Sequence, residues 1–175
     1  MKRVSASVVA TVAAVLCALP VAAEVLTTWD SVINGPGRFR VLRDFGHAAV
    51  LDRETGLVWE QSPGTTTRTW LAAHMFCNDR AVGNRNRKGW RLPTVQELAS
   101  LVDATQAFPA LPVGHPFGNV QSDFYWSATT LGADPAKAWG ADFGGIVEGG
   151  ARYSDKIIPR LVWCVRTGHG GPDVQ

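Results

Sequence analysis

The positions of the cysteines limit the possible folds of this 175-residue chain more than any other feature. Cys17 lies in an apolar N-terminal segment, whereas Cys77 and Cys164 lie far apart in the rest of the chain. Such a pair can form a disulfide, belong to a metal site or supply a reactive thiol, and the redox compartment decides among these roles. Zinc sites are usually built from local Cys-x-x-Cys pairs, which the sequence lacks, so metal ligation is not expected.

Residues 1–23 have the pattern of a secretory signal peptide, with an expected cleavage after Ala23. Lys2 and Arg3 precede an apolar run that is shorter than the roughly 20 residues needed to cross a bilayer, and no later run is of spanning length. Leu16 precedes Cys17, where lipoprotein processing requires a small residue. The sequence predicts secretion across the inner membrane, to the periplasm or the cell surface, with no transmembrane segment after cleavage; a retained anchor helix is the alternative.

In an oxidising compartment, the simplest state of Cys77 and Cys164 is a disulfide. The chain-entropy model gives so long a loop a stabilisation of about 4–5 kcal/mol, as an upper figure. Residues 24–175 are enough for one sizeable core. A catalytic role for Cys77 or Ser127 stays open in principle, but no base can be assigned to either residue.

The remaining chain divides into an N-terminal arm (24–38), one compact domain (39–168) and a flexible glycine-rich tail (169–175). Short β-rich runs at 47–51 and 57–60, separated by a turn that ends at Gly56, predict a β-hairpin. Further strands are predicted at 123–130, 138–147, 150–158 and 161–166.

Two segments have helical character. Residues 69–77 place Trp70, Ala73 and Cys77 on one face, together with His74. A capping box at Thr94 and Glu97 predicts a second helix, whose buried stripe is formed by Leu98, Leu101 and Val102. The pattern predicts an α+β domain with a mostly antiparallel sheet flanked by two helices, because the connections between the late strands are short.

The composition argues against a nucleic-acid-binding protein. The chain has 17 Lys and Arg against 15 Asp and Glu, and loss of Lys2 and Arg3 with the signal peptide makes the balance neutral. His47, His74, His115 and His169 have no spacing typical of a ligand set, and the common catalytic motifs are absent from the sequence. We therefore expect no enzyme and no cofactor.

A basic segment follows the first predicted helix and is the main candidate for a binding site. Its cations could hold sulfated or carboxylated polysaccharide through charge-assisted contacts, although such a run is more often a solvated loop. The candidate ligand-binding residues are Arg80, Arg85, Arg87 and Lys88, with Arg91 close by.

The seven tryptophans raise the possibility of sugar stacking. Trp59, Trp90, Trp126 and Trp163 lie within apolar runs and are expected in the core, which leaves Trp29, Trp70 and Trp139 open to a binding role. Four late acidic residues lack the alternation of a calcium loop and are interpreted as turn and surface residues. They are Asp134, Asp142, Glu148 and Asp155.

Five sequence blocks occur in the order that is typical of one family. Through these blocks the chain resembles the Lcl C-terminal domain family over about residues 39–168. The blocks are DRETGLVWE at 52–60, Trp70 with Ala73 and Cys77, GWRLPT at 89–94 with Glu97 and Leu98, YWSAT at 125–129, and WCVR at 163–166.

The resemblance implies a fold related to C-type lectin-like domains and formylglycine-generating enzymes. It also implies that Cys77 and Cys164 form a structural bridge, because they match the family's helix and last-strand cysteines. The family's namesake is the tail of a collagen-like bacterial adhesin that binds sulfated glycosaminoglycans, but this chain has no collagen repeat and so lacks the avidity of a trimeric stalk. No binding residue can be carried over from the family.

The expected function is a secreted, non-catalytic, lectin-like binding module of the bacterial envelope that recognises an acidic or sulfated glycan in adhesion. The alternatives are a structural or protein-interaction subunit of the envelope, and an enzyme of the oxidase superfamily.

Overall fold

The structure is a computed structural model that describes residues 37–144 and 150–168. The predicted signal peptide (1–23), most of the predicted arm (24–36) and the predicted tail (169–175) lie outside the described residues, so those predictions are untested. The elements in chain order are β1 (Phe39–Val41), the 3-10 helix η1 (Arg43–Phe45), β2 (Ala49–Asp52), β3 (Leu57–Glu60), α1 (Trp70–Asp79), α2 (Val95–Ala99), β4 (Phe124–Thr130), β5 (Lys137–Asp142), β6 (Gly150–Asp155) and β7 (Val165–Thr167).

The first sheet has four antiparallel strands in the order β1-β2-β3-β7. The predicted hairpin forms its centre and is confirmed, with Ala49 opposite Glu60 and Asp52 opposite Leu57. Gly56 closes the turn with a φ of 69°, a conformation that favours glycine. All residues of β2 and β3 are buried, because this sheet has packed side chains on both faces.

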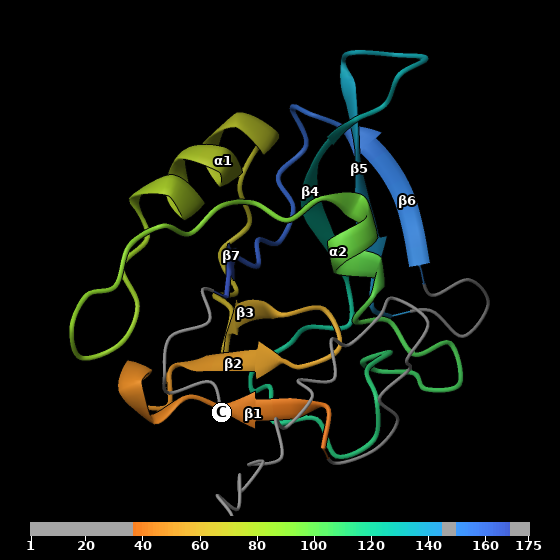
Figure 1. Ribbon diagram of the computed structural model, residues 1–175. Helices are drawn as coiled ribbons and strands as arrows, with labels where there is room; N and C mark the ends of the chain where they lie inside the picture. The colour runs from red at the N-terminus through yellow and green to blue at the C-terminus, as the bar shows by residue number, and fades with distance from the viewer. Residues whose placement is uncertain (1–36, 145–149, 169–175) are drawn as a thin grey trace, which may run out of the picture.

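The second sheet has three antiparallel strands in the order β4-β5-β6 (Figure 1). The α+β class with antiparallel strands and two α-helices is confirmed, but the strands form two sheets where the sequence predicted one. The predicted strands at 138–147 and 150–158 are shorter, since β5 ends at Asp142 and β6 at Asp155.

The predicted last strand, 161–166, is mostly not a strand. Leu161–Cys164 is buried and runs between the two sheets, where Leu161 forms a single parallel bridge with Tyr125. Only Val165–Thr167 joins a ladder, as β7 beside β3. The apolar pattern of residues 161–164 therefore reflects their burial between the two sheets. It does not reflect pairing within a sheet.

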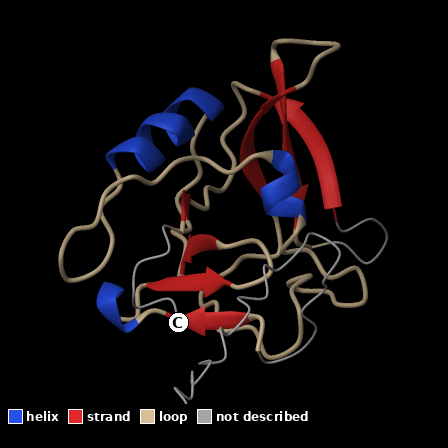
Figure 2. Cartoon of the chain, in the orientation of Figure 1, coloured by secondary structure: helices blue, strands red, loops and turns tan. Residues whose placement is uncertain are grey.

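Both predicted helices are present (Figure 2). α1 buries Ala73 and Cys77, as predicted. The capping box at the start of α2 is confirmed, because the Thr94 hydroxyl accepts from the Glu97 N–H and the Glu97 carboxylate accepts from the Thr94 N–H. α2 is only five residues long, so Leu101 is buried from the turn that follows it.

The core consists of two clusters of buried side chains. One surrounds the disulfide and includes Trp90 and Trp126; the other is centred on Trp59 and Trp163, whose rings lie 5.6 Å apart. All four tryptophans predicted to be in the core are buried. Among the described residues, no helix is long and apolar enough to span a membrane.

Candidate functional site

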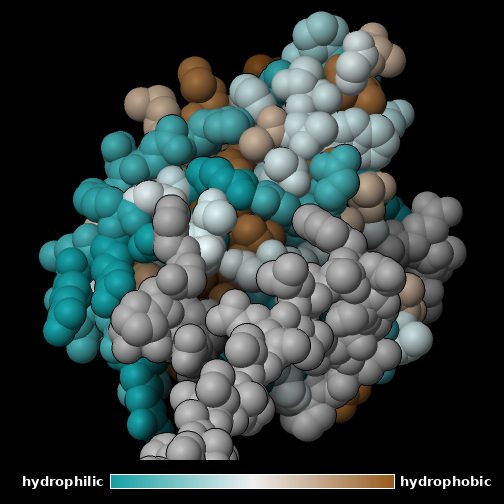
Figure 3. Space-filling model, viewed as in Figure 1, coloured by the Kyte–Doolittle hydropathy of each residue, from teal (hydrophilic) through white to brown (hydrophobic). Residues whose placement is uncertain are grey.

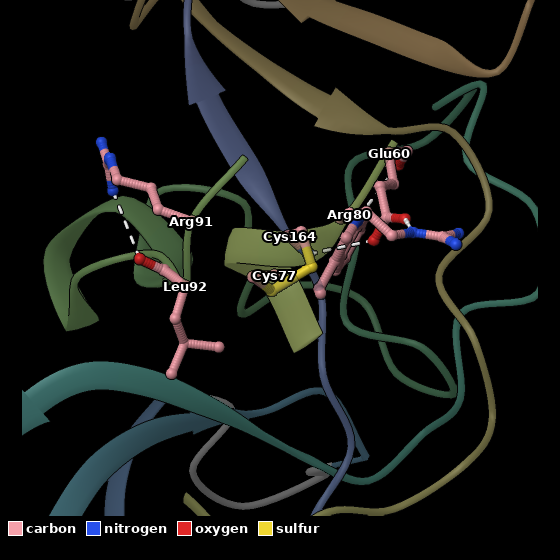
Figure 4. The surroundings of a disulfide bond; sticks show 7 residues. Glu60, Cys77, Arg80, Arg91, Leu92 and Cys164 are labelled. Carbon is pink, nitrogen blue, oxygen red and sulfur yellow. Dashed lines mark hydrogen bonds and ion pairs between the residues drawn. A yellow bond between two sulfur atoms is a disulfide. The ribbon is translucent and has the colours of Figure 1, made fainter. Parts of the chain in front are cut away.

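Cys77 and Cys164 form a disulfide, with their sulfur atoms 2.06 Å apart (Figure 4). Both residues are completely buried. The bridge ties α1 to the segment that leads into β7, as the sequence predicted. No free thiol is therefore available at either position in this structure.

Glu60, at the end of β3, is buried beside the disulfide and is 2% exposed. Its Oε1 accepts a hydrogen bond from Nε of Arg80 at 2.5 Å, and its Oε2 accepts from the N–H of Cys164 at 3.1 Å (Figure 4). The Glu60 carbonyl accepts from Nε1 of Trp163 at 2.9 Å. This carboxylate therefore joins β3, the C-terminal end of α1 and the disulfide.

Arg80, one of the four candidate ligand-binding residues, is thus occupied in neutralising a buried carboxylate. The sequence pattern groups Arg80 with the cations that follow it and gives no partner role to Glu60. The only sequence hint was a glutamate that ends an otherwise apolar strand, and its partner comes from a distant segment.

Arg85, Arg87 and Lys88 lie on the loop after α1, which projects from the left of the molecule in Figure 1 beside η1. We call residues 81–89 the basic loop. Val82 and Arg87 close it with reciprocal backbone hydrogen bonds of 3.1 and 3.0 Å. Gly83 is required there, because a Cβ at this position would lie 2.5 Å from the carbonyl oxygen of Phe45. Arg85 and Lys88 are exposed and Arg87 is half-buried.

The structure adds a cation from β7 to this site. The guanidinium groups of Arg87 and Arg166 lie 4.8 and 5.6 Å from the ring centre of Phe45. Burial, followed by the charge of Arg87, lowers the pKa of Arg166. Because two like charges share one aromatic platform, an anion bound there would relieve their repulsion.

The basic loop is anchored to its neighbours without losing its charge. Nζ of Lys88 donates to the Asp79 carbonyl at 2.8 Å, and the Arg166 guanidinium donates to the Lys88 carbonyl at 3.1 Å. Among the described residues, the ion pairs within 4.0 Å involve none of the four cations Arg85, Arg87, Lys88 and Arg166.

Arg91 differs from these four, because it forms a bidentate pair with Glu97 at 2.8 and 2.6 Å. Burial favours the neutral form of Glu97, but hydrogen bonds from Arg91 and from the Thr94 backbone keep its pKa below its usual value. Arg91 therefore stabilises the start of α2 and is not available to a ligand.

The two described tryptophans left open by the sequence are half-buried. Trp70 donates through Nε1 to the Ser127 carbonyl at 2.8 Å and carries the Lys156 ammonium over its ring at 4.0 Å. Trp139 packs edge-on against Tyr153 with ring centres 5.6 Å apart. Trp29 lies outside the described residues.

Three of the histidines and late carboxylates, His115, Asp134 and Asp142, have local structural contacts. His115 Nδ1 accepts from the Phe117 N–H, while Asp134 and Asp142 accept backbone hydrogen bonds within their own turns. His169 and Glu148 lie outside the described residues. Within residues 37–144 and 150–168, no three His, Cys, Asp or Glu side chains gather as a metal site would require.

These features define a disulfide-bonded α+β domain with a cationic loop after its first helix, and the cations of this loop have no ion pair among the described residues. The model of the Lcl C-terminal domain matches residues 48–166, and the chain belongs to this family, as the motif order predicted. No curated protein matches the chain.

Proposed function

We propose that this protein is a secreted, non-catalytic, lectin-like module of the bacterial envelope that binds acidic or sulfated glycans in adhesion. The observation that carries the proposal is the group formed by Arg85, Arg87, Lys88 and Arg166, none of which lies in an ion pair within the described chain. Contacts with Phe45 and with two backbone carbonyls anchor Arg87, Lys88 and Arg166. The antiparallel α+β architecture and the family support a relation to C-type lectin-like domains.

The chemistry of the basic loop suits sulfate and carboxylate groups. Guanidinium groups bind such anions through two parallel N–H donors, and these charge-assisted hydrogen bonds are stronger than neutral ones. The backbone of Arg87 is held by Val82 and by Nε1 of Trp90, so its side chain starts from a fixed point. A ligand therefore meets a partly ordered site, which lowers the entropy cost of binding.

The disulfide argues against oxidase-like thiol chemistry and is in agreement with export. Oxidase-like thiol chemistry needs an accessible thiolate, whereas Cys77 and Cys164 are bridged and buried. Disulfides persist in oxidising compartments, in agreement with the signal-peptide pattern of residues 1–23. We therefore propose the periplasm or the outer surface as the location of the protein.

The test is binding of the oxidised domain to immobilised heparin at low and at physiological salt. Arg85→Glu, alone and combined with Arg87→Glu and Lys88→Glu, should weaken binding, and the triple variant should lose more than about tenfold in affinity. Arg53→Glu is the matched control for the single variant, because Arg53 is an exposed turn arginine at the β2–β3 connection. An equal loss of heparin affinity in Arg85→Glu and Arg53→Glu would show that only net charge matters, and would contradict a site at the basic loop. The absence of salt-sensitive binding by the parent protein would reject the proposal.

A second candidate function, a protein-interaction subunit of the envelope, is favoured by an exposed apolar surface. Leu71 and Met75 are 66% and 59% exposed one turn apart on α1, and Ile157 is 82% exposed. The Trp70 N–H donates to the Lys156 carbonyl at 3.0 Å, so Ile157 follows directly beside the start of α1. Apolar side chains stand out at the upper edge of Figure 3, above α1. One stoichiometric partner, lost with Leu71→Gln and Met75→Gln, would favour this function.

A further inference from the structure

We infer that a groove along the C-terminal half of α1 binds one acidic sugar unit of the same polysaccharide chain that the basic loop holds. This inference rests on the proposed function and extends it to residues outside the basic loop. The groove has a volume of about 450 Å³. It is lined by Arg68, Ala72, Met75, Phe76, Asp79, Arg80 and Ala81.

The charged side of the groove is built on the ring of Phe76. The guanidinium groups of Arg68 and Arg80 lie 4.2 and 5.2 Å from its ring centre. Glu60 neutralises Arg80, whereas Arg68 lies in no ion pair within the described residues. Arg68 is therefore the cation in the groove that is free to bind an anion.

The backbone of Arg68 is fixed, which holds the root of its side chain in place. It exchanges two backbone hydrogen bonds of 2.8 Å with Arg160, and its carbonyl also accepts from Nε1 of Trp126 at 3.0 Å. The guanidinium then lies against Phe76 through a cation–π contact. Such a pre-ordered cation loses less conformational entropy when it binds an anion.

Part of the groove lining is aliphatic. Ala72 and Met75 supply aliphatic surface, and Met75 is largely exposed. A pyranose ring with a carboxylate or sulfate substituent has a C–H face and a charged edge, so it matches a lining that combines aliphatic side chains with a guanidinium. The groove thus fits an acidic sugar better than a small inorganic anion, which would leave the aliphatic side chains unused.

The groove meets the basic loop at the end of α1. Asp79 and Arg80 line the groove, and Nζ of Lys88 donates to the Asp79 carbonyl at 2.8 Å. A polysaccharide held by Lys88 is therefore adjacent to the groove. The Asp79 carboxylate repels an anion in the groove. Removal of this charge should therefore strengthen binding, whereas removal of the Arg68 charge should weaken it.

The experiment compares a heparin-derived tetrasaccharide with a dodecasaccharide by calorimetry, using the oxidised secreted protein. Arg68→Gln should weaken dodecasaccharide binding by about three- to fivefold, as for one exposed ion pair, and leave tetrasaccharide binding within about twofold. Asp79→Asn should strengthen dodecasaccharide binding. Met75→Glu places a negative charge on the groove wall at an exposed position and should weaken it.

Arg53→Gln is the matched control for Arg68→Gln, and thermal melting checks that each variant is folded. Unchanged dodecasaccharide binding by Arg68→Gln and Met75→Glu would overturn the inference that the groove binds a sugar unit. The proposed function would not be affected by this result, because it is tested separately by the basic-loop variants. Weaker binding by Asp79→Asn would also overturn the inference about the groove. Loss of tetrasaccharide binding with Arg68→Gln but not with the basic-loop triple variant would show that the groove binds sugars independently of the basic loop. This result would overturn the inference that one polysaccharide chain occupies both. If neither oligosaccharide bound the parent protein, the proposed function itself would fail.

Discussion

Arg80 and Arg87 belong to one short basic stretch of sequence, yet the structure gives them opposite surroundings. Arg80 turns toward the disulfide and pairs with the buried carboxylate of Glu60. Arg87 turns toward η1, where it shares the ring of Phe45 with Arg166 and has no acidic partner in the described chain. The role of each cation in this stretch therefore depends on the residues that the fold brings next to it.

The surroundings of Arg80 and of Arg87 contribute differently to the free energy of unfolding. A buried carboxylate without its cation is strongly unfavourable, so Arg80 contributes to stability. Exposed cations without partners contribute little to stability, and their repulsion is a small cost that a bound anion removes. The disulfide end of the molecule is thus expected to govern folding and the basic loop to govern binding.

Removal of the disulfide should have the largest effect. Cys77→Ala with Cys164→Ala should lower the free energy of unfolding by up to about 4–5 kcal/mol, because the unfolded chain regains the freedom of a long loop. Denaturant unfolding of the oxidised parent and the variant measures the difference. A loss below about 1 kcal/mol would contradict the explanation by loop entropy.

Removal of Arg80 should come next. Arg80→Ala leaves the Glu60 carboxylate buried and unpaired, at a cost of about 2–3 kcal/mol; this is below the range for a fully buried pair because Arg80 is 35% exposed. Urea denaturation provides the measurement. The double variant Glu60→Gln with Arg80→Met should recover part of the loss, and no recovery would contradict the explanation by an unpaired charge.

The basic loop should show the reverse behaviour. Arg85→Gln should change the free energy of unfolding by no more than about 0.5 kcal/mol, because the side chain is exposed and lies in no ion pair of the described chain. Heparin affinity of the same variant should fall. A strongly destabilised Arg85→Gln would remove the separation between folding and binding regions.

The smallest expected effect is the pH dependence of stability caused by His74. This side chain packs against Trp70, whose ring also carries the Lys156 ammonium. Burial, followed by the charge of Lys156, lowers the pKa of His74, and its Nε2 is buried without a hydrogen-bond partner. Because the unfolded chain takes up the proton near pH 6.5 and the folded chain only at lower pH, stability should fall as the pH drops below about 6.5. Lys156→Gln should raise the pKa of His74, as measured by NMR titration; an unchanged value would leave burial as the only cause.

The elements predicted from sequence were those set by neighbouring residues. The hairpin around Gly56 and the capping box of Thr94 and Glu97 depend on contacts within a few positions, and both are confirmed. The four core tryptophans were recognisable because their apolar neighbours are buried with them. The last strand was mispredicted because burial between two sheets and pairing within a sheet produce the same apolar pattern.

The sequence alone determined the family, the disulfide partners and the location of the basic segment, since each is written in residue types and their order. Tertiary structure decided which cations of that segment are neutralised: Glu60 reaches Arg80 from β3, and Arg166 reaches Phe45 from β7. These pairings join positions far apart in the chain. Their energies depend on burial and on distances between side chains, which no local pattern specifies.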